Sequence, residues 1–164
     1  MALSMQAYAQ SDSVSLDAVT VRGFVPQRFM SGLKTQRIDS SALAQARFQN
    51  ISDVLAAFTP IAFRNYGPGQ LSTASFRGTS SNHTAVLWNG LNINAPTLGQ
   101  TDFSTIPVAG FDELSVQYGS AASIVGSDAV GGSILLGSRA PKNPFHIAVG
   151  RQEESYHNRQ TQAD

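Results

Sequence analysis

The stretch that decides the fold is YGSAASIVGSDAVGGSILL, Tyr118–Leu136, in which four glycines precede an apolar run. Glycine-rich segments beside apolar strands often bind phosphate through backbone N–H groups. A phosphate loop of the G-x-x-x-x-G-K-[ST] type also needs a lysine, but no lysine or arginine lies between Asp112 and Ser138. We therefore interpret the glycines as structural positions that permit tight turns and close backbone approach. They are Gly119, Gly126, Gly131 and Gly132.

The segments before and after this stretch predict short β-strands. DELSVQY alternates Leu114, Val116 and Tyr118 on one face, and SILLGS continues as another strand. TAVLWNGLNIN contains two β runs around Asn89-Gly90. Asn-Gly is a strong hairpin signal, because a type I′ turn needs positive φ at both central residues. IAFRN and STASFRG predict two further strands with YGPGQ as their turn, whereas DFSTIP is expected to be a loop or single turn.

Two short helices are predicted before the strands. Asp39 and the serines after it supply N-cap chemistry for a helix over residues 42–48. Asn50 is expected to cap a second helix, with Asp53 near its positive end. Thr59-Pro60 ends this helix, because the residue before proline avoids the helical region. Its apolar face follows the i, i+3, i+4, i+7 pattern through Ile51, Val54, Leu55 and Phe58. Residues 25–138 are thus expected to form an α+β domain with a small mixed β-sheet and short helices.

The composition excludes several function classes. Eleven basic and eleven acidic residues give zero net charge, which argues against a nucleic-acid partner. There is no cysteine, so disulfides and thiolate metal sites are excluded. His83, His146 and His157 are too scattered to predict a metal site, and the sequence contains no G-x-S-x-G nucleophile elbow. We predict no catalytic residue, metal or cofactor, and therefore no enzyme.

The N-terminal region predicts an exported leader followed by an extended peptide. Ala7-Tyr8-Ala9 fits a signal-peptidase site, so residues 1–15 are expected to be the remnant of a signal peptide and a disordered leader. The alternative is a disordered leader that has no role in export. Within residues 16–24, Val19, Thr20 and Val21 are β-branched and prefer extended backbone, and the flanks of the segment are polar. The segment forms either an edge strand of this domain or a peptide offered for strand addition to another protein.

The C-terminal region, residues 139–164, predicts a linker and one strand. RAPKNP contains two prolines, and FHIAVGRQ places Phe145, Ile147 and Val149 on one side of a strand. A polar tail follows to Asp164. The strand is expected to be the first of a structure whose remainder is missing.

In order and spacing, these segments resemble the plug domain of TonB-dependent outer-membrane receptors. The resemblance runs through ISDVLAAFTPIAFRNYGPG, the Arg77-Gly78 strand end in ASFRG, and NHTAVLWNGLNIN. Its most specific part is DFSTIPVAGFDELSVQYGSAASIVGSDAVGGSILL. It covers about Leu16 to Ser138. Asn89 stands where the family has aspartate, and Ile61 follows Pro60 where the family has glycine.

The resemblance implies a gating and energy-coupling plug that blocks a barrel lumen in the outer membrane, with its N-terminus in the periplasm. Its partners would be the periplasmic C-terminal domain of TonB, its own β-barrel, and a small-molecule nutrient or metal chelate such as a siderophore, haem or cobalamin. The implied TonB box within residues 16–24 comprises Asp17, Ala18, Val19, Thr20 and Val21. The implied ligand-facing residues are Tyr66, Gly67, Gln70, Asn92, Asn94 and Gln100. The alternative is a stand-alone soluble periplasmic binding or regulatory module with a plug-like fold.

Overall fold

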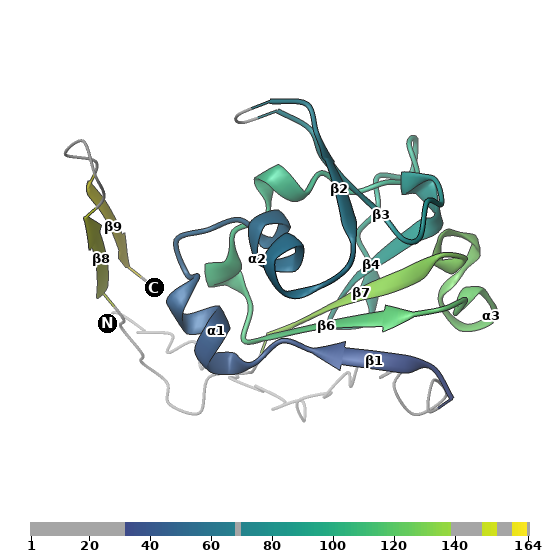
Figure 1. Cartoon of the computed structure of the whole chain (residues 1–164), viewed down its shortest axis with the longest axis horizontal. Coiled ribbons are helices and arrows are strands. Elements are labelled where there is room, and N and C mark those ends of the chain that lie inside the picture. The colour runs from purple at the N-terminus through teal and green to yellow at the C-terminus, as the bar shows by residue number, and fades with distance from the viewer. Residues whose placement is uncertain (1–31, 68–69, 139–148, 154–158, 164) are drawn as a thin grey trace, which may run out of the picture.

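A five-stranded mixed sheet organises the domain in the computed structural model, which describes residues 32–67, 70–138, 149–153 and 159–163. The strand order is β1-β6-β7-β4-β5 (Figure 1). β4 and β7 pair in parallel, and the other neighbours pair antiparallel. The mixed sheet predicted from the sequence is therefore confirmed. The strands are β1 Lys34–Arg37, β4 Thr84–Trp88, β5 Leu91–Asn92, β6 Glu113–Tyr118 and β7 Gly132–Gly137.

Two short helices pack on one face of this sheet (Figure 1). Helix α1, Ser40–Gln45, begins after Asp39, whose carboxylate accepts a hydrogen bond from Ser41 N at 3.2 Å, as N-cap chemistry predicts. Helix α2, Ile51–Phe58, has the predicted bounds and Asn50 as its N-cap residue. Within the described part of the chain, the Asn50 side chain makes no capping hydrogen bond, so only its position matches the prediction.

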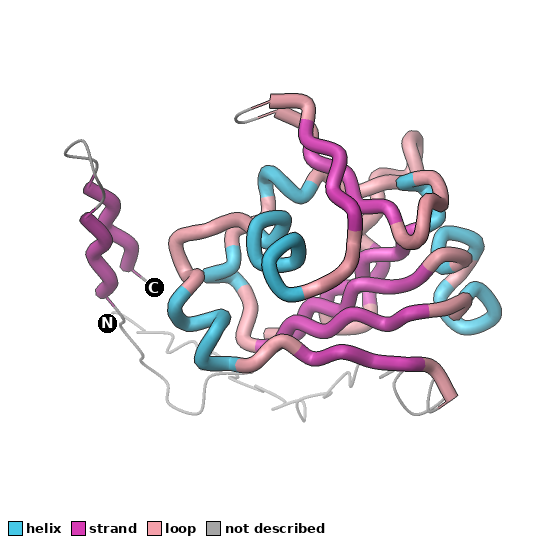
Figure 2. The backbone as a smooth tube through the Cα atoms, viewed as in Figure 1, coloured by secondary structure: helices cyan, strands magenta, loops and turns pink. Residues whose placement is uncertain are grey.

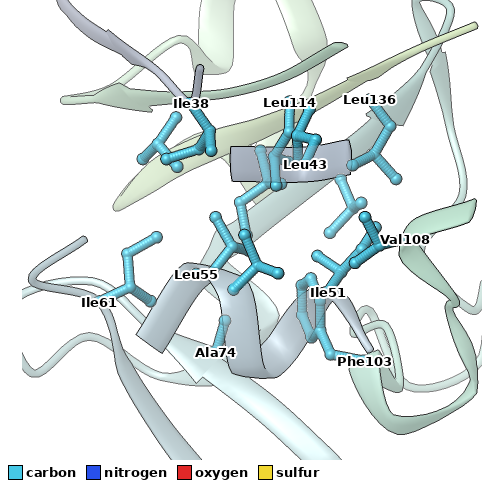
Figure 3. Close-up of a cluster of buried hydrophobic side chains, with 14 of the residues drawn as sticks. Ile38, Leu43, Ile51, Leu55, Ile61, Ala74, Phe103, Val108, Leu114 and Leu136 are labelled. Carbon is cyan, nitrogen blue, oxygen red and sulfur yellow. The ribbon is translucent and has the colours of Figure 1, made fainter. Parts of the chain in front are cut away.

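The main core lies between α2 and the sheet (Figure 3). Ile51, Val54 and Leu55 are buried on α2, and the alternation along β6 buries Leu114 and Val116 on the face that meets them. The apolar face predicted for this strand is therefore confirmed. The face predicted for this helix is confirmed at Ile51, Val54 and Leu55 and wrong at Phe58, the last residue of α2, which is 49% exposed. Each aliphatic side chain of this kind contributes about 1.5–3 kcal/mol relative to an exposed one, so this contact stabilises the packing of α2 on the sheet.

A separate two-stranded ribbon projects beyond the sheet (Figure 1). It consists of β2, Ala62–Asn65, and β3, Ser72–Ser75, paired antiparallel from Ala62↔Ser75 to Asn65↔Ser72. Phe63 anchors the ribbon by packing edge-on against Phe103, with ring centres 5.5 Å apart. The ribbon thus carries its connecting turn away from the sheet.

Short helical turns connect the remaining elements. The glycine-rich stretch forms helix α3, which the sequence pattern did not predict, and a 3-10 turn. Among the described residues, no helix is long and apolar enough to cross a membrane. The short elements are η2 Ser81–His83, η3 Phe103–Thr105, η4 Val108–Gly110, α3 Ala122–Val125 and η5 Ser127–Ala129.

The C-terminal region differs from the expectation of one strand and a polar tail. β8, Val149–Glu153, pairs antiparallel with β9, Arg159–Ala163, which lies in that tail (Figure 2). The prediction of an unpartnered strand is therefore wrong. Strand pairing satisfies backbone groups whether or not the side chains are apolar, so the polar composition of the tail did not reveal its strand. Residues 139–148 lie outside the described part of the chain.

Candidate functional site

The glycine pair at the start of β7 is a close-packing position. A β-carbon on Gly131 would lie 2.6 Å from Thr79 Oγ1, and one on Gly132 would lie 2.7 Å from two ring carbons of Phe76. Gly132 would also meet the Gln117 carbonyl oxygen at 2.8 Å. These distances leave no room for a β-carbon, which is consistent with the interpretation that the two glycines permit close approach.

The backbone amides of the glycine-rich stretch donate hydrogen bonds within the domain. Gly126 N donates to Ala122 O at 3.0 Å, Ala129 N donates to Gly126 O at 3.1 Å, and Gly131 N donates to His83 O at 2.9 Å. These groups would have to be free to bind an anion. The geometry therefore supports packing rather than phosphate binding. Gly119 and Gly126 take positive φ angles of 104° and 122°, which suits them to turns.

The β4–β5 turn has the backbone that its Asn-Gly sequence predicts. Asn89 has φ 49° and Gly90 has φ 90°, so both central residues lie at positive φ. The side chain of Asn89 also makes a contact outside the turn: its Oδ1 accepts a hydrogen bond from Ser138 N at 2.9 Å. The turn therefore holds the end of β7 as well as joining two strands.

The ribbon tip, residues 65–71, presents three of the predicted ligand-facing residues; Pro68 and Gly69 lie outside the described part of the chain. Tyr66 is 55% exposed, and Gln70 is also exposed. Gly67 has φ 141°, and its N–H donates to Asn65 Oδ1 at 3.1 Å. The tip therefore exposes the aromatic ring of Tyr66 and the side-chain amide of Gln70.

The second loop, residues 92–102, contains the predicted ligand-facing segment 92–100 and is organised around Asn94. This side chain is only 9% exposed. Its Oδ1 accepts from Val86 N at 3.2 Å and from Thr101 Oγ1 at 2.8 Å. Its Nδ2 donates to Thr84 O at 3.0 Å and to Gly99 O at 3.1 Å. The Asn94 side chain therefore holds the loop against β4, which is a positioning role.

Asn92 and Gln100 surround this buried amide. Asn92 Oδ1 accepts from Asn94 N at 2.9 Å, and its Nδ2 donates to Asp128 Oδ2 at 3.3 Å. Gln100 Oε1 accepts from Ser81 Oγ at 2.6 Å. The structure thus brings Asn92, Asn94 and Gln100 together in one loop. Of these three, Asn92 is exposed and Gln100 is half-buried.

Asp102 connects the second loop to the ribbon. Its Oδ1 accepts hydrogen bonds from Ser72 N, Ser104 N and Ser104 Oγ at 3.0, 3.0 and 2.8 Å. Burial acts to raise the pKa of Asp102, but these hydrogen bonds outweigh it and hold the pKa below its ordinary value. The sequence analysis missed this residue, because Ser72 lies far away along the chain.

A cavity of about 230 Å³ beside β1 was also missed by the sequence analysis. Lys34 Nζ lies 5.8 Å from the ring centre of Tyr118, whose hydroxyl donates to Gln36 Oε1 at 2.8 Å. Burial raises the pKa of Tyr118, and the nearby Arg77 guanidinium opposes that change. The residues that line the cavity are distant from one another in the sequence, so no local motif marks the cavity. They are Lys34, Gln36, Pro60, Phe76, Arg77 and Tyr118.

Two further predictions concern metal binding and TonB binding. The described residues contain no group of three or more histidine, cysteine, aspartate or glutamate side chains arranged to hold a metal ion. Asp17–Val21, the segment predicted to bind TonB, lies outside the described part of the chain, and its role stays a prediction.

Comparison with known proteins gives matches along most of this domain. A family model described as TonB-dependent Receptor Plug Domain matches residues 28–133. The vitamin B12 transporter BtuB of Photobacterium profundum is 39% identical over 111 residues, which are 66% of this chain and 18% of the relative. BtuB of Vibrio vulnificus is 31% identical over 123 residues, covering 72% of this chain and 20% of the relative. The chain therefore spans about a fifth of the length of these relatives.

Solved structures show the same fold at low sequence identity. The ferric yersiniabactin uptake receptor FyuA of Yersinia pestis has a TM-score of 0.61 at 20% identity, covering 79% of this chain and 20% of that one. The siderophore receptor PirA of Acinetobacter baumannii has a TM-score of 0.57 at 21% identity, covering 88% and 23%. These two matches support the α+β architecture.

Proposed function

Because the chain belongs to the plug-domain family of TonB-dependent receptors, we propose that it is the gating and energy-coupling plug of an active-transport receptor. The single observation that carries this proposal is the family match over residues 28–133, which includes both organised loops and the four glycines of the glycine-rich stretch. The relatives named above are transporters and receptors. Family membership places the domain in the outer membrane, inside a receptor barrel, as the sequence analysis predicted.

The ribbon tip and the loop of residues 92–102 are proposed to face the ligand. Tyr66 and Gln70 are exposed at the tip, whereas Asn94 fixes the second loop through its buried hydrogen bonds. Asp102 ties the two segments together through Ser72. A ligand held by both segments would therefore meet a preorganised surface, which lowers the entropy cost of binding.

Cobalamin is the first ligand to test. Two relatives at 39% and 31% identity are named as vitamin B12 transporters. The siderophore receptors of known structure are about 20% identical and bear on the fold alone. A neutral corrinoid rich in amide groups could pair with Gln70 and stack on Tyr66.

Energy coupling is proposed to act through Asp17–Val21. Val19, Thr20 and Val21 are β-branched and favour the extended backbone that strand addition requires. In strand addition, the peptide's main-chain N–H and C=O groups pair with the edge of a partner sheet. The periplasmic domain of TonB would supply that edge and pull on the plug, with the barrel wall as the fixed frame.

The experiment uses the full-length receptor in cells with and without TonB. We expect uptake of radiolabelled cyanocobalamin only when TonB is present, and binding to purified receptor that weakens about tenfold in Tyr66→Ala, as loss of a stacked aromatic ring implies. Ser120→Ala, an exposed position outside both loops, is the matched control. Uptake that is equal without TonB would overturn the energy-coupling role. Binding of a ferric siderophore in place of cobalamin would overturn the cargo.

A further inference from the structure

The turn between β4 and β5 carries the single Asn-Gly pair of the chain, Asn89-Gly90. Asparagine is a thermolabile residue, because the main-chain nitrogen of the following residue can attack its side-chain amide carbon. Glycine offers the least hindered nitrogen for this attack, since it has no side chain. Both residues lie at positive φ, and Asn89 is exposed. The turn is therefore a candidate site for a chemical change that the chain makes in itself.

The two nitrogens that react in this chemistry are free of other contacts. Among the residues that the structure describes, neither the Gly90 N–H nor the Asn89 Nδ2 donates a hydrogen bond. The main-chain N–H of Asn89, in contrast, donates to Leu136 O at 2.8 Å and holds this residue beside the end of β7. The Gly90 nitrogen can thus approach, and Nδ2 can leave, without losing a hydrogen bond of its own.

The oxygen of the same side-chain amide is held by a main-chain donor. Ser138 N donates to Asn89 Oδ1 at 2.9 Å. Attack on the amide carbon turns this oxygen into an oxyanion, and a positioned N–H group stabilises negative charge that develops in this way. Ser138 is itself fixed beside the turn, because its Oγ accepts a hydrogen bond from Trp88 Nε1 at 2.9 Å. The donor therefore lies where the charge develops.

From this arrangement we propose that Asn89-Gly90 is a self-modification site, at which Asn89 is deamidated through a cyclic imide with the Ser138 N–H as oxyanion donor. The Gly90 nitrogen gives its proton to solvent and forms a bond to Asn89 Cγ. The bond from Cγ to Nδ2 then breaks, and Nδ2 takes up a proton and leaves as ammonia. Water hydrolyses the imide, and the step needs no oxidant or reductant.

The imide can open in two ways that differ in their effect on the turn. Water that attacks Cγ leaves an aspartate and a main chain of unchanged length. Water that attacks the main-chain carbonyl carbon leaves an isoaspartate, whose main chain is one carbon longer. Trp88 pairs with Leu91 across a two-residue turn, so the longer chain would disturb this register. The Ser138 N–H polarises the Cγ carbonyl, so the folded domain should favour aspartate, which can still accept that hydrogen bond.

The first test incubates the purified chain in mildly alkaline water enriched in heavy oxygen and maps its peptides by mass spectrometry. Asn82 is the internal control, because it is exposed and is followed by a histidine instead of a glycine. Asn89 should convert at least about tenfold faster than Asn82, and heavy oxygen should enter the new acid, because water opens the imide. Equal rates at Asn89 and Asn82 would overturn the assignment of this site.

Two variants test the oxyanion donor. Ser138→Pro removes the main-chain N–H, whereas Ser138→Ala keeps it and is the matched control. Deamidation of Asn89 should be about tenfold slower in Ser138→Pro than in Ser138→Ala, as loss of such a donor implies. Equal rates in the two variants would show that the Ser138 N–H has no part in the reaction.

The ratio of the two products tests the same donor without a substitution. The folded chain should give a higher ratio of aspartate to isoaspartate than the same chain unfolded in urea, where Ser138 is no longer held against Asn89. Fragmentation by electron transfer in the mass spectrometer distinguishes the two acids, and equal ratios would contradict the proposal. None of these measurements involves TonB, a barrel or a ligand, so this inference and the proposed function can fail separately.

Discussion

Gly132 lies against Phe76 so closely that a β-carbon at this position would come within 2.7 Å of two carbons of the aromatic ring. The same β-carbon would meet the Gln117 carbonyl oxygen of the adjacent strand β6 at 2.8 Å. Phe76 is buried, and its ring packs edge-on against Tyr118 at 5.8 Å between centres. The space at the start of β7 is therefore closed by both a ring and a backbone group.

Gly132→Ala should lower the free energy of unfolding by about 1–3 kcal/mol, because overpacking forces the ring and β6 to shift. Urea unfolding of the purified chain measures this change. Gly110→Ala is the matched control, since a β-carbon there would meet nothing within 4 Å. If Gly132→Ala were as stable as Gly110→Ala, the close-packing role of the glycine pair would be wrong.

Asn94→Asp should destabilise the loop of residues 92–102 more than its small size change suggests. The substitution replaces an N–H donor with an oxygen that faces Thr84 O, Gly99 O and the Asp128 carboxylate, which lies 3.3 Å from Nδ2. Leaving buried acceptors unsatisfied costs about 1–3 kcal/mol, and the added negative charge increases that cost. The expected result is a loss of at least about 2 kcal/mol in the free energy of unfolding.

The matched control for this loop is Asn82→Asp, which adds the same charge at an exposed position. Hydrogen exchange adds a local measurement. Asn94→Asp should increase exchange at Val86 N, which donates to Asn94 Oδ1, because the β4 contact loosens. Equal stability of the two variants would show that the amide does not hold the loop.

Acidification should weaken the connection between the ribbon and the second loop. The folded-state pKa of Asp102 lies below its ordinary value of 3.8. A lowered pKa means that the stabilisation is fully present above the unfolded-state value and is lost as pH falls through the folded-state value. The unfolding free energy should therefore drop as the pH falls below about 4, and Asp102→Asn should reduce the size of that drop.

Urea unfolding at about pH 6 and about pH 2 measures this difference. The pKa of Asp39 is also lowered, by the hydrogen bonds that it accepts from Ser41, so Asp39→Asn should remove a separate part of the same drop. The two residues lie in different elements, and their effects should add in the double variant. An unchanged drop in Asp102→Asn would contradict the assigned role of this carboxylate.

Local sequence signals predicted much of the fold. The apolar spacing of Ile51, Val54 and Leu55 predicted the buried face of α2, and Asn89-Gly90 predicted a hairpin whose two positive φ angles are present. In both cases, the signal lies within a few neighbouring residues. α3 was not predicted, because its short sequence has no periodicity long enough to mark it.

The loop contacts could not be predicted in the same way. Asn94 was expected among residues that face a ligand, yet its amide is buried and bonded to Thr84 and Gly99. Asp102 meets Ser72 across the connection between loop and ribbon. Such pairings depend on how distant segments pack, so a single sequence shows the residue types and leaves the partners undetermined.

The most direct test of energy coupling measures binding of the purified periplasmic domain of TonB to the full-length receptor and to its Val19→Pro variant. Proline removes one main-chain donor and restricts the backbone, so strand addition at Asp17–Val21 should fail. Val19→Ala keeps the donor, and Val14→Pro places the same disruption outside the segment. The account predicts binding weaker by at least about tenfold in Val19→Pro and near-unchanged binding in Val19→Ala and Val14→Pro. Equal binding by the receptor and its Val19→Pro variant would contradict it.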